Sequence, residues 1–238
     1  MNGSTVLGIS LCIAFAAVPA ISQEVAAGSV RTHIEGIEIP PIADAPFTAK
    51  VVVTWNKPLM GGGVVSRKYY TLVARDSQGR VHRETREFLP ADSAAEPPLR
   101  GFTILDPVSG TRTTCTKASM TCATSAFDAN LALTENAADR ANANGESLGQ
   151  QTMEGLPTTG TRQTMSNVSG PRGNSRLAVS RTDAWYSPDL HIDLSVTRTD
   201  PQLGLVTLQV TDLVQGEPSS RWFAIPSEYT VKGRKTQQ

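Results

Sequence analysis

Apolar residues occupy alternate positions in two neighbouring segments near the end of the chain, residues 190–196 and 206–210. Because successive side chains of a β-strand point to opposite faces, each segment predicts a strand with one buried and one solvated face. Pro201 and Gly204 lie between the two segments and favour a turn, so the two strands are expected to pair antiparallel.

Further strand signals are bounded by residues that favour turns. They fall at residues 49–55, 64–75, 80–88, 101–105, 111–116, 177–186 and 222–225. About ten strands joined by short loops argue against a doubly wound α/β fold, which needs crossover helices. The sequence predicts a mainly β protein with a single antiparallel curved sheet or half-barrel, the alternative being a β-sandwich, and at most one or two short helices.

Residues 123–149 interrupt the strand pattern. Ser125 and Asp128 have the spacing of a helix capping box, and Phe127 and Leu131 lie one helical turn apart. The same tract is rich in Ala, Asn, Asp and Glu and has few residues that a core would bury. A short helix and a surface linker are both consistent with it.

The amino terminus has the features of an export signal. The apolar run Val6–Val18 is followed by small residues, and residues 1–22 are predicted to be a signal peptide. No stretch reaches the roughly twenty apolar residues that span a bilayer, so no transmembrane span is expected after signal removal. We expect a periplasmic or secreted protein with a flexible lead-in at 23–46, a single β domain at 47–231 and a polar tail at 232–238.

The cysteines and the net charge bear on disulfide formation and on the choice of partners. Cys12 belongs to the predicted signal, which leaves Cys115 and Cys122 as an even pair; a disulfide is predicted, with two free thiols as the alternative. Lys plus Arg and Asp plus Glu both total 22, so no overall field attracts nucleic acid, and none is expected as a partner.

Sequence signatures of catalysis are weak. The chain lacks HExxH, P-loop and GxGxxG motifs, and the GxSxG match around Ser147 follows a polar tract where a nucleophile elbow needs a buried strand. Asp189, His191 and Asp193 alternate on a predicted strand and are candidate metal ligands, but they are equally explained as its solvated face. We expect no catalytic residue, no metal and no cofactor.

Two groups of residues are candidate binding sites. Aromatic residues that either line a ligand groove or fill the core are Trp185, Tyr186, Trp222 and Phe223. Basic residues that either bind an anionic partner or protect a strand edge are Arg75, Arg80, Arg83 and Arg86.

Residues 147–231 resemble a family of exported bacterial proteins of unassigned function. The segments that carry the resemblance are GQQTMEGLPTTGTRQT, AWYSPDLHIDLSVTRTDPQLGLVTLQVTDL and FAIPSEYTV. The order of EGL and GTR, then WYSPDL, then IPSEY is also similar to half-barrel proteins related to periplasmic lipoprotein carriers and envelope-stress sensors. That resemblance implies a curved antiparallel sheet that binds lipid or lipoprotein, and it implies no catalytic residues.

The leading hypothesis is therefore a non-catalytic, exported envelope protein. Its curved sheet is expected to bind an apolar ligand, such as a lipid or lipoprotein, or an envelope protein partner. A hydrolase of unknown type and an architectural envelope module without a ligand are the alternatives.

Overall fold

The structure, a computed structural model, describes residues 37–134, 145–169, 176–201 and 203–232. The predicted signal peptide, residues 23–36 of the lead-in, the centre of the 123–149 tract and residues 233–238 of the polar tail lie outside the described residues. Among the described residues, no helix is both long enough and apolar enough to cross a membrane.

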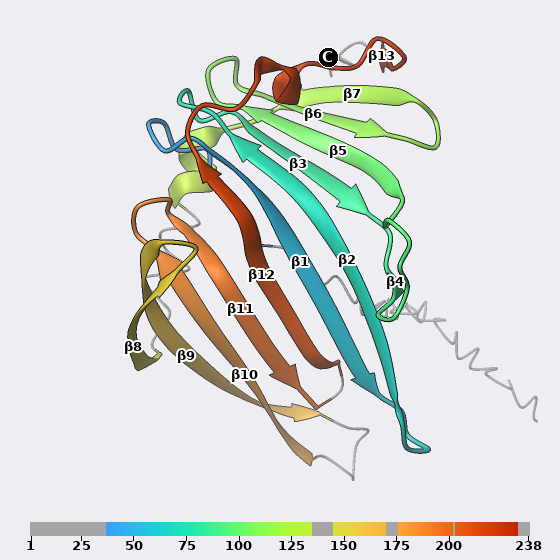
Figure 1. Cartoon of the computed structure of the whole chain (residues 1–238), viewed down its shortest axis with the longest axis vertical. Coiled ribbons are helices and arrows are strands. Elements are labelled where there is room, and N and C mark those ends of the chain that lie inside the picture. The colour runs from blue at the N-terminus through green and yellow to red at the C-terminus, as the bar shows by residue number, and fades with distance from the viewer. Residues whose placement is uncertain (1–36, 135–144, 170–175, 202, 233–238) are drawn as a thin grey trace, which may run out of the picture. The chain divides into compact units, whose positions relative to one another are not determined.

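Thirteen strands in the described residues form one curved sheet (Figure 1). They are β1 (Phe47–Pro58), β2 (Val64–Arg75), β3 (Val81–Arg86), β4 (Leu89–Pro90), β5 (Leu99–Asp106), β6 (Thr111–Thr116), β7 (Thr121–Ala126), β8 (Glu146–Met153), β9 (Leu156–Ser169), β10 (Arg176–Ser187), β11 (Ile192–Asp200), β12 (Gly204–Gln215) and β13 (Thr230–Lys232). Residues 129–134, the last of their described segment, are helical, and a 3-10 turn, η1, occupies Ser220–Phe223. The predicted mainly β fold with a single curved sheet is confirmed.

Strand order follows from two antiparallel meanders. The order across the sheet is β13-β7-β6-β5-β3-β2-β1-β12-β11-β10-β9-β8, with β4 pairing to β2 outside this path. β1 and β12 join the two meanders, in a register that runs from Phe47 opposite Gln215 to Asn56 opposite Leu205. Only β13, which pairs with β7, is parallel to its neighbour among these strands.

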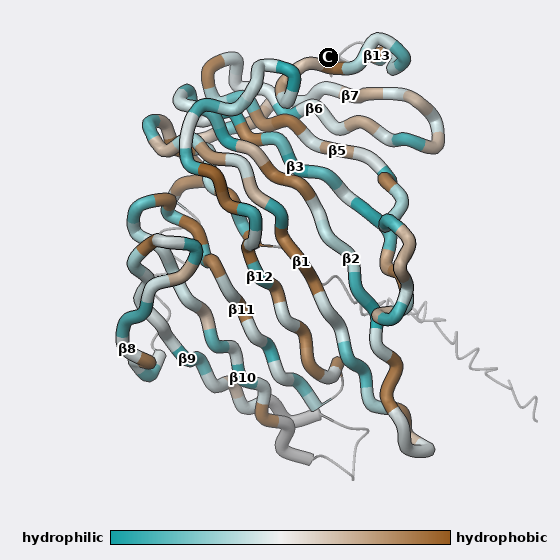
Figure 2. Tube along the Cα trace, viewed as in Figure 1, coloured by the Kyte–Doolittle hydropathy of each residue, from teal (hydrophilic) through white to brown (hydrophobic). Residues whose placement is uncertain are grey.

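One face of the central strands forms the main core. The alternating residues of the predicted strand pair, including Ile192, Leu194 and Leu208, are each at most 3% exposed. On β1, Phe47 and Val53 are fully buried on the same face. Figure 2 shows the resulting alternation of hydrophobic and hydrophilic positions along β1, β11 and β12. The period-two pattern thus identifies the buried face correctly.

The end of the lead-in belongs to this core, which differs from the flexible segment that the sequence predicts at 23–46. Ile37 is 4% and Ile39 is 3% exposed, and both pack with the residues of β1, β11 and β12. After them the chain turns at the two prolines, where the N–H of Ile42 bonds to Pro40 O at 2.9 Å. The prolines were the stronger sequence signal for a loop, but the apolar residues beside them determine the packing.

A second, smaller core lies at the β5–β7 end of the sheet. Phe102, Ile104, Cys115, Cys122 and Tyr229 form it. Cys115 and Cys122 sit directly opposite each other on β6 and β7 and form a disulfide, as predicted.

The strand predicted at 222–225 is not formed. Ser220–Phe223 is instead the 3-10 turn η1, and the backbone becomes extended only at Ala224. The turn places the Trp222 ring against His82 and the Phe223 ring over Arg80, so side-chain contacts with this end of the sheet replace a strand ladder here.

Replacing both cysteines, C115S together with C122S, should lower the free energy of unfolding by about 2.5 kcal/mol, because the disulfide restricts a short loop of the unfolded chain. Urea titration of the oxidised protein and the double variant measures the difference. Reduction of the unsubstituted protein should produce the same loss of stability. Equal stabilities of the oxidised protein and the double variant would show that this loop is already ordered in the unfolded chain, so that the disulfide adds no restriction.

Candidate functional site

An open cleft of about 820 Å³ lies at the end of the sheet where β1 begins. Figure 1 shows the helix at 129–134 beside the turn that leads into β1. The lining residues, which define the rim cleft, are Pro41, Ile42, Ala43, Gln78, Pro107, Ala126, Phe127, Asp128, Ala129, Asn130 and Leu133. Four separate segments contribute to this lining, which is why the strand pattern of the sequence does not indicate it.

Asp128 starts the helical wall of the rim cleft. Its Oδ1 accepts hydrogen bonds from the backbone N–H groups of Asn130 at 2.9 Å and Leu131 at 3.1 Å, which is the geometry of a helix N-cap. The helix alternative for residues 123–149 is therefore the one formed at 129–134, with Asp128 as the cap in place of Ser125. Leu133 lines the cleft, whereas Leu131 is 55% exposed to solvent.

The opposite wall is held by contacts between the lead-in and the β2–β3 turn. Asp44 donates its backbone N–H to Ser77 O at 3.0 Å. Gly79 has a φ of +80°, and a Cβ at this position would lie 2.9 Å from Pro41 O. The absence of a side chain at Gly79 therefore permits two things: the left-handed backbone of the turn and the close approach of the lead-in at Pro41.

Arg75, at the end of β2, connects the lead-in to the second meander. Its side chain is fully buried, and its Nε donates to Ala45 O at 2.9 Å. Nη1 donates to Pro40 O at 3.0 Å, and Nη2 donates to Leu190 O at 2.7 Å. The guanidinium also lies 5.0 Å from the centre of the Phe47 ring. Arg75 therefore does not face a partner, in contrast to its predicted place in a basic surface.

Burial lowers the pKa of Arg75 to about 10, so the side chain remains a cation at neutral pH. A buried charge is tolerated only when hydrogen bonds replace its hydration, and the three carbonyl oxygens do so here. The neighbouring Asp76 is also fully buried, and its Oδ2 binds Arg80 Nε at 2.6 Å.

The other basic residues of the hairpin do not form one cationic surface either. Arg80 is paired with Asp76 and lies 4.7 Å from the Phe223 ring centre. Arg86 binds Glu84 at 2.6 Å and Glu96 at 2.9 Å. Arg83 pairs opposite Val73 and is half-buried. Within the described residues, carboxylates of Asp76, Glu84 and Glu96 therefore neutralise much of the positive charge of the hairpin.

The four aromatic candidates lie in two separate places. Trp185 on β10 lies opposite Gly160 on β9, where a Cβ would come within 2.7 Å of its ring. Tyr186 Oη lies 3.1 Å from His191 Nδ1. Trp222 and Phe223 belong to η1, which contacts β3 on the other side of the central strands. These residues do not converge on one groove.

The weaker catalytic motifs also lack the geometry that their chemistry requires. Ser147 is exposed near the start of the edge strand β8, where a nucleophile elbow needs a strand-to-helix turn. His191 has a φ of +55° and precedes β11, so Asp189 and His191 lie in a turn. No set of three or more potential metal ligands occurs in the described part of the chain.

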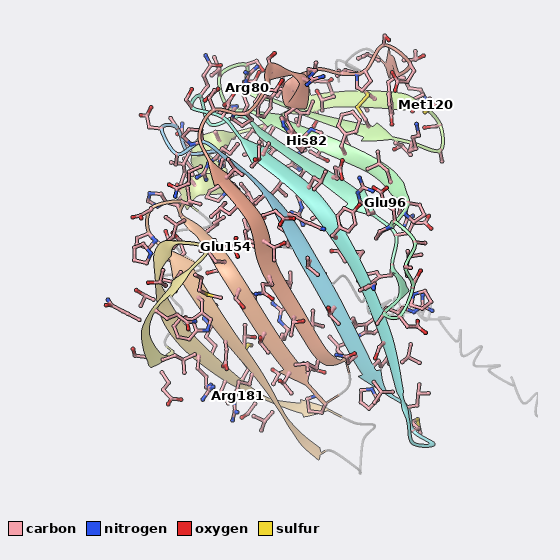
Figure 3. All side chains as sticks on the ribbon, in the orientation of Figure 1. Arg80, His82, Glu96, Met120, Glu154 and Arg181 are labelled. Atoms are coloured by element: carbon pink, nitrogen blue, oxygen red, sulfur yellow. A yellow bond between two sulfur atoms is a disulfide. The ribbon has the colours of Figure 1, made fainter. Side chains whose placement is uncertain are left out.

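His82 joins η1 to the sheet. Figure 3 labels His82 at this end of the sheet. Its ring centroid is 5.2 Å from that of Phe102 and 5.2 Å from that of Trp222. Burial lowers the pKa of His82 below its ordinary value, and this effect outweighs the opposing influence of Glu84. Its Nδ1 has no hydrogen-bond partner among the described residues. We interpret His82 as a neutral packing residue.

Substitution of Arg75 by Leu should lower the free energy of unfolding by about 3 kcal/mol or more, because three buried carbonyl groups lose their donor. Arg75→Lys should recover only part of this, since an ammonium group cannot reach all three oxygens. The exposed Arg67 on the same strand is the control, and Arg67→Leu should change stability by about 0.5 kcal/mol or less. Urea denaturation compares them; equal stability of the two Leu variants would contradict this role.

Folding stability should fall with acidification through His82. Above its ordinary pKa of 6.5, the side chain is neutral in both states; below it, the unfolded chain binds a proton that the folded chain excludes. The loss is at most about 1.4 kcal/mol per pH unit for this group. His82→Phe should flatten the slope of unfolding free energy against pH, measured by urea titration. An unchanged slope would assign the effect to other groups.

No protein-family model and no curated protein match the chain. Among solved structures, LprF from Mycobacterium bovis aligns over 77% of this chain and 90% of its own, with 14% identity and a TM-score of 0.33. MucB aligns over 79% of this chain and 60% of its own, with 14% identity and a TM-score of 0.36. The LolA superfamily protein NE2245 from Nitrosomonas europaea aligns over 79% and 93%, with 9% identity and a TM-score of 0.31.

Proposed function

We propose that this protein is a non-catalytic envelope protein, periplasmic or secreted, that binds an apolar ligand of the acyl-chain class in the rim cleft. The apolar lining of the cleft is the observation that carries the proposal. Eight of its eleven lining residues are apolar, the exceptions being Gln78, Asp128 and Asn130. Its volume of about 820 Å³ is within the range of small-molecule sites in proteins, roughly 300–1,000 Å³.

The rim cleft is a better site for this ligand than the face of the curved sheet. Phe47, Val53 and Leu194 at the centre of that face are fully buried, so protein already occupies the space there. The cleft, in contrast, is open and bounded by turns and a short helix. Openness of this kind lets a flexible ligand enter without disturbing the main core.

Two further observations support the assignment. The disulfide between Cys115 and Cys122 fits a protein that folds in an oxidising compartment. The buried Arg75 fixes the carbonyl groups of Pro40 and Ala45, which flank the cleft residues 41–43. One wall of the site is therefore held in place before a ligand arrives, which lowers the entropic cost of binding.

Filling the cleft tests the proposal. The full chain is titrated with the fluorescent apolar probe N-phenyl-1-naphthylamine, and palmitate is then added to displace the probe. Ala129→Trp places a large ring in the cleft and should weaken probe binding about tenfold, because the ring occupies the ligand volume.

Leu131→Trp is the matched control, since Leu131 lies on the same helix, is exposed and does not line the cleft. It should bind the probe like the unsubstituted chain. Equal binding by both Trp variants would place the ligand elsewhere, and failure of palmitate to displace the probe would exclude the acyl-chain class.

A further inference from the structure

The turn between β1 and β2 carries a concentrated group of exposed apolar residues at the end of the sheet opposite the rim cleft. Leu59 is 49%, Met60 109%, Val64 61% and Val65 37% exposed. With the glycines between them, Gly61–Gly63, these residues form what we call the apolar tip. Figure 2 shows hydrophobic residues at this end of the hairpin.

The apolar tip extends beyond the neighbouring strands. β1 and β2 remain paired to Pro58 opposite Val64, but the pairing of β1 with β12 ends at Asn56. On the other side, the short strand β4 pairs with β2 only at Arg67 and Lys68. A Cβ built on any of the three tip glycines would meet no atom within 4 Å. The tip therefore projects into open space, while the hairpin below it is held by both neighbours.

The backbone of the tip satisfies part of its own hydrogen-bonding need. Leu59 donates its N–H to Gly63 O at 3.1 Å, and Gly62 donates to Leu59 O at 3.1 Å. Gly62 and Gly63 adopt φ values of +88° and +85°, which allow this tight turn. Internal bonding of this kind matters in an apolar medium, where an unpaired backbone group has no water to bind.

A rigid aromatic base lies beneath the tip. Trp55 donates its indole N–H to Leu203 O at 2.6 Å and packs 6.2 Å from the Phe88 ring. Phe88 in turn lies 4.5 Å from the Tyr69 ring on β2. These contacts tie β1 and β2 to the β11–β12 turn and to the loop near β4, so the tip is presented in a defined orientation.

The charges that β1 and β2 carry near the tip are all positive. Between residues 54 and 74 the chain contains Lys57, Arg67 and Lys68, and it contains no Asp or Glu. One carboxylate, Asp92, follows β4 at the side of the hairpin, where the N–H of Ala91 bonds to Ser66 O at 3.0 Å, so cations outnumber it three to one. None of these three side chains forms an ion pair within the described residues. Apolar side chains beyond a ring of cations match a bilayer surface, whose acyl region lies beneath anionic head groups.

We propose that the apolar tip is a membrane-docking element that inserts Leu59, Met60 and Val64 into the surface of an anionic bilayer while Lys57, Arg67 and Lys68 bind the head groups. This interaction is independent of the rim cleft, which lies at the other end of β1 and β2. A protein surface would instead be expected to offer carboxylates to these cations in a fixed geometry, and a second copy of this tip would bring like charges together.

The first test is co-sedimentation of the full chain with vesicles of phosphatidylethanolamine and phosphatidylglycerol, mixed at about three to one, with phosphatidylcholine vesicles as the neutral reference. The double variant L59D/M60D should reduce binding to the anionic vesicles about tenfold or more, because it removes buried apolar area and adds repulsive charge. Val108→Asp is the control, because Val108 is a 73% exposed apolar turn residue at the opposite end of the sheet, and it should leave binding unchanged.

The second test reads the tip directly, because the apolar run Val6–Val18 could bind lipid in every variant. A tryptophan at the tip, M60W, should add emission that shifts to shorter wavelength on the anionic vesicles and is quenched by brominated acyl chains, measured as the difference from the unsubstituted chain with its own three tryptophans. Unchanged emission, or L59D/M60D sedimenting like the unsubstituted chain, would overturn the proposal. Tip-dependent dimerisation in sedimentation velocity without vesicle binding would overturn it in favour of self-association. Neither result alters probe binding in the rim cleft, so the two proposals fail separately.

Discussion

The buried guanidinium of Arg75 is the interaction on which the arrangement of the chain around its main core depends. A cation without water is tolerated only with its hydrogen bonds satisfied, and Arg75 obtains them from carbonyl groups of two distant segments, the lead-in and the turn before β11. Those segments must therefore keep their positions for the core to form. Ile37 and Ile39 are brought onto the sheet beside it, and the wall of the rim cleft continues from the same stretch. One polar side chain thus coordinates the packing of an otherwise aliphatic core.

Period-two patterning was sufficient for the central strands, because burial of one face is a local property that each strand carries in its own sequence. Tyr69, Thr71, Val73 and Arg75 alternate along β2, and Val73 is buried, so the alternation itself placed Arg75 on the core face. The abundance of charge in the hairpin favoured a surface interpretation instead. Burial of a long cation depends on carbonyl groups that only the tertiary structure supplies.

The candidate sites were harder to predict than the strands for a related reason. Trp185 and Trp222 were grouped as scarce aromatic residues, but strand order separates them by the whole central sheet. The rim cleft draws on four segments, the lead-in, the β2–β3 turn, the β5–β6 turn and the stretch after β7. Their proximity depends on strand pairing within the first meander, which no local motif encodes. The apolar tip is different: the run from Leu59 to Val65 is visible in the sequence as apolar residues around three glycines. That this run projects beyond the sheet follows only from the strand register, which shows that β12 and β4 end before the tip.

The two lateral borders of the sheet are treated differently, and this bears on how the molecule stays discrete. An extended array of unsatisfied main-chain groups recruits further strands and seeds fibrils. At one border, β13 from the carboxyl-terminal region adds in parallel and covers β7. At the other, β8 carries a register shift between Ser147 and Gly149, and Gly149 has a φ of +88°. A kinked, polar border offers a poor template for another chain. Both edges of the curved sheet are therefore poor sites for pairing with a strand of another molecule. The strand edges themselves protect the protein against aggregation.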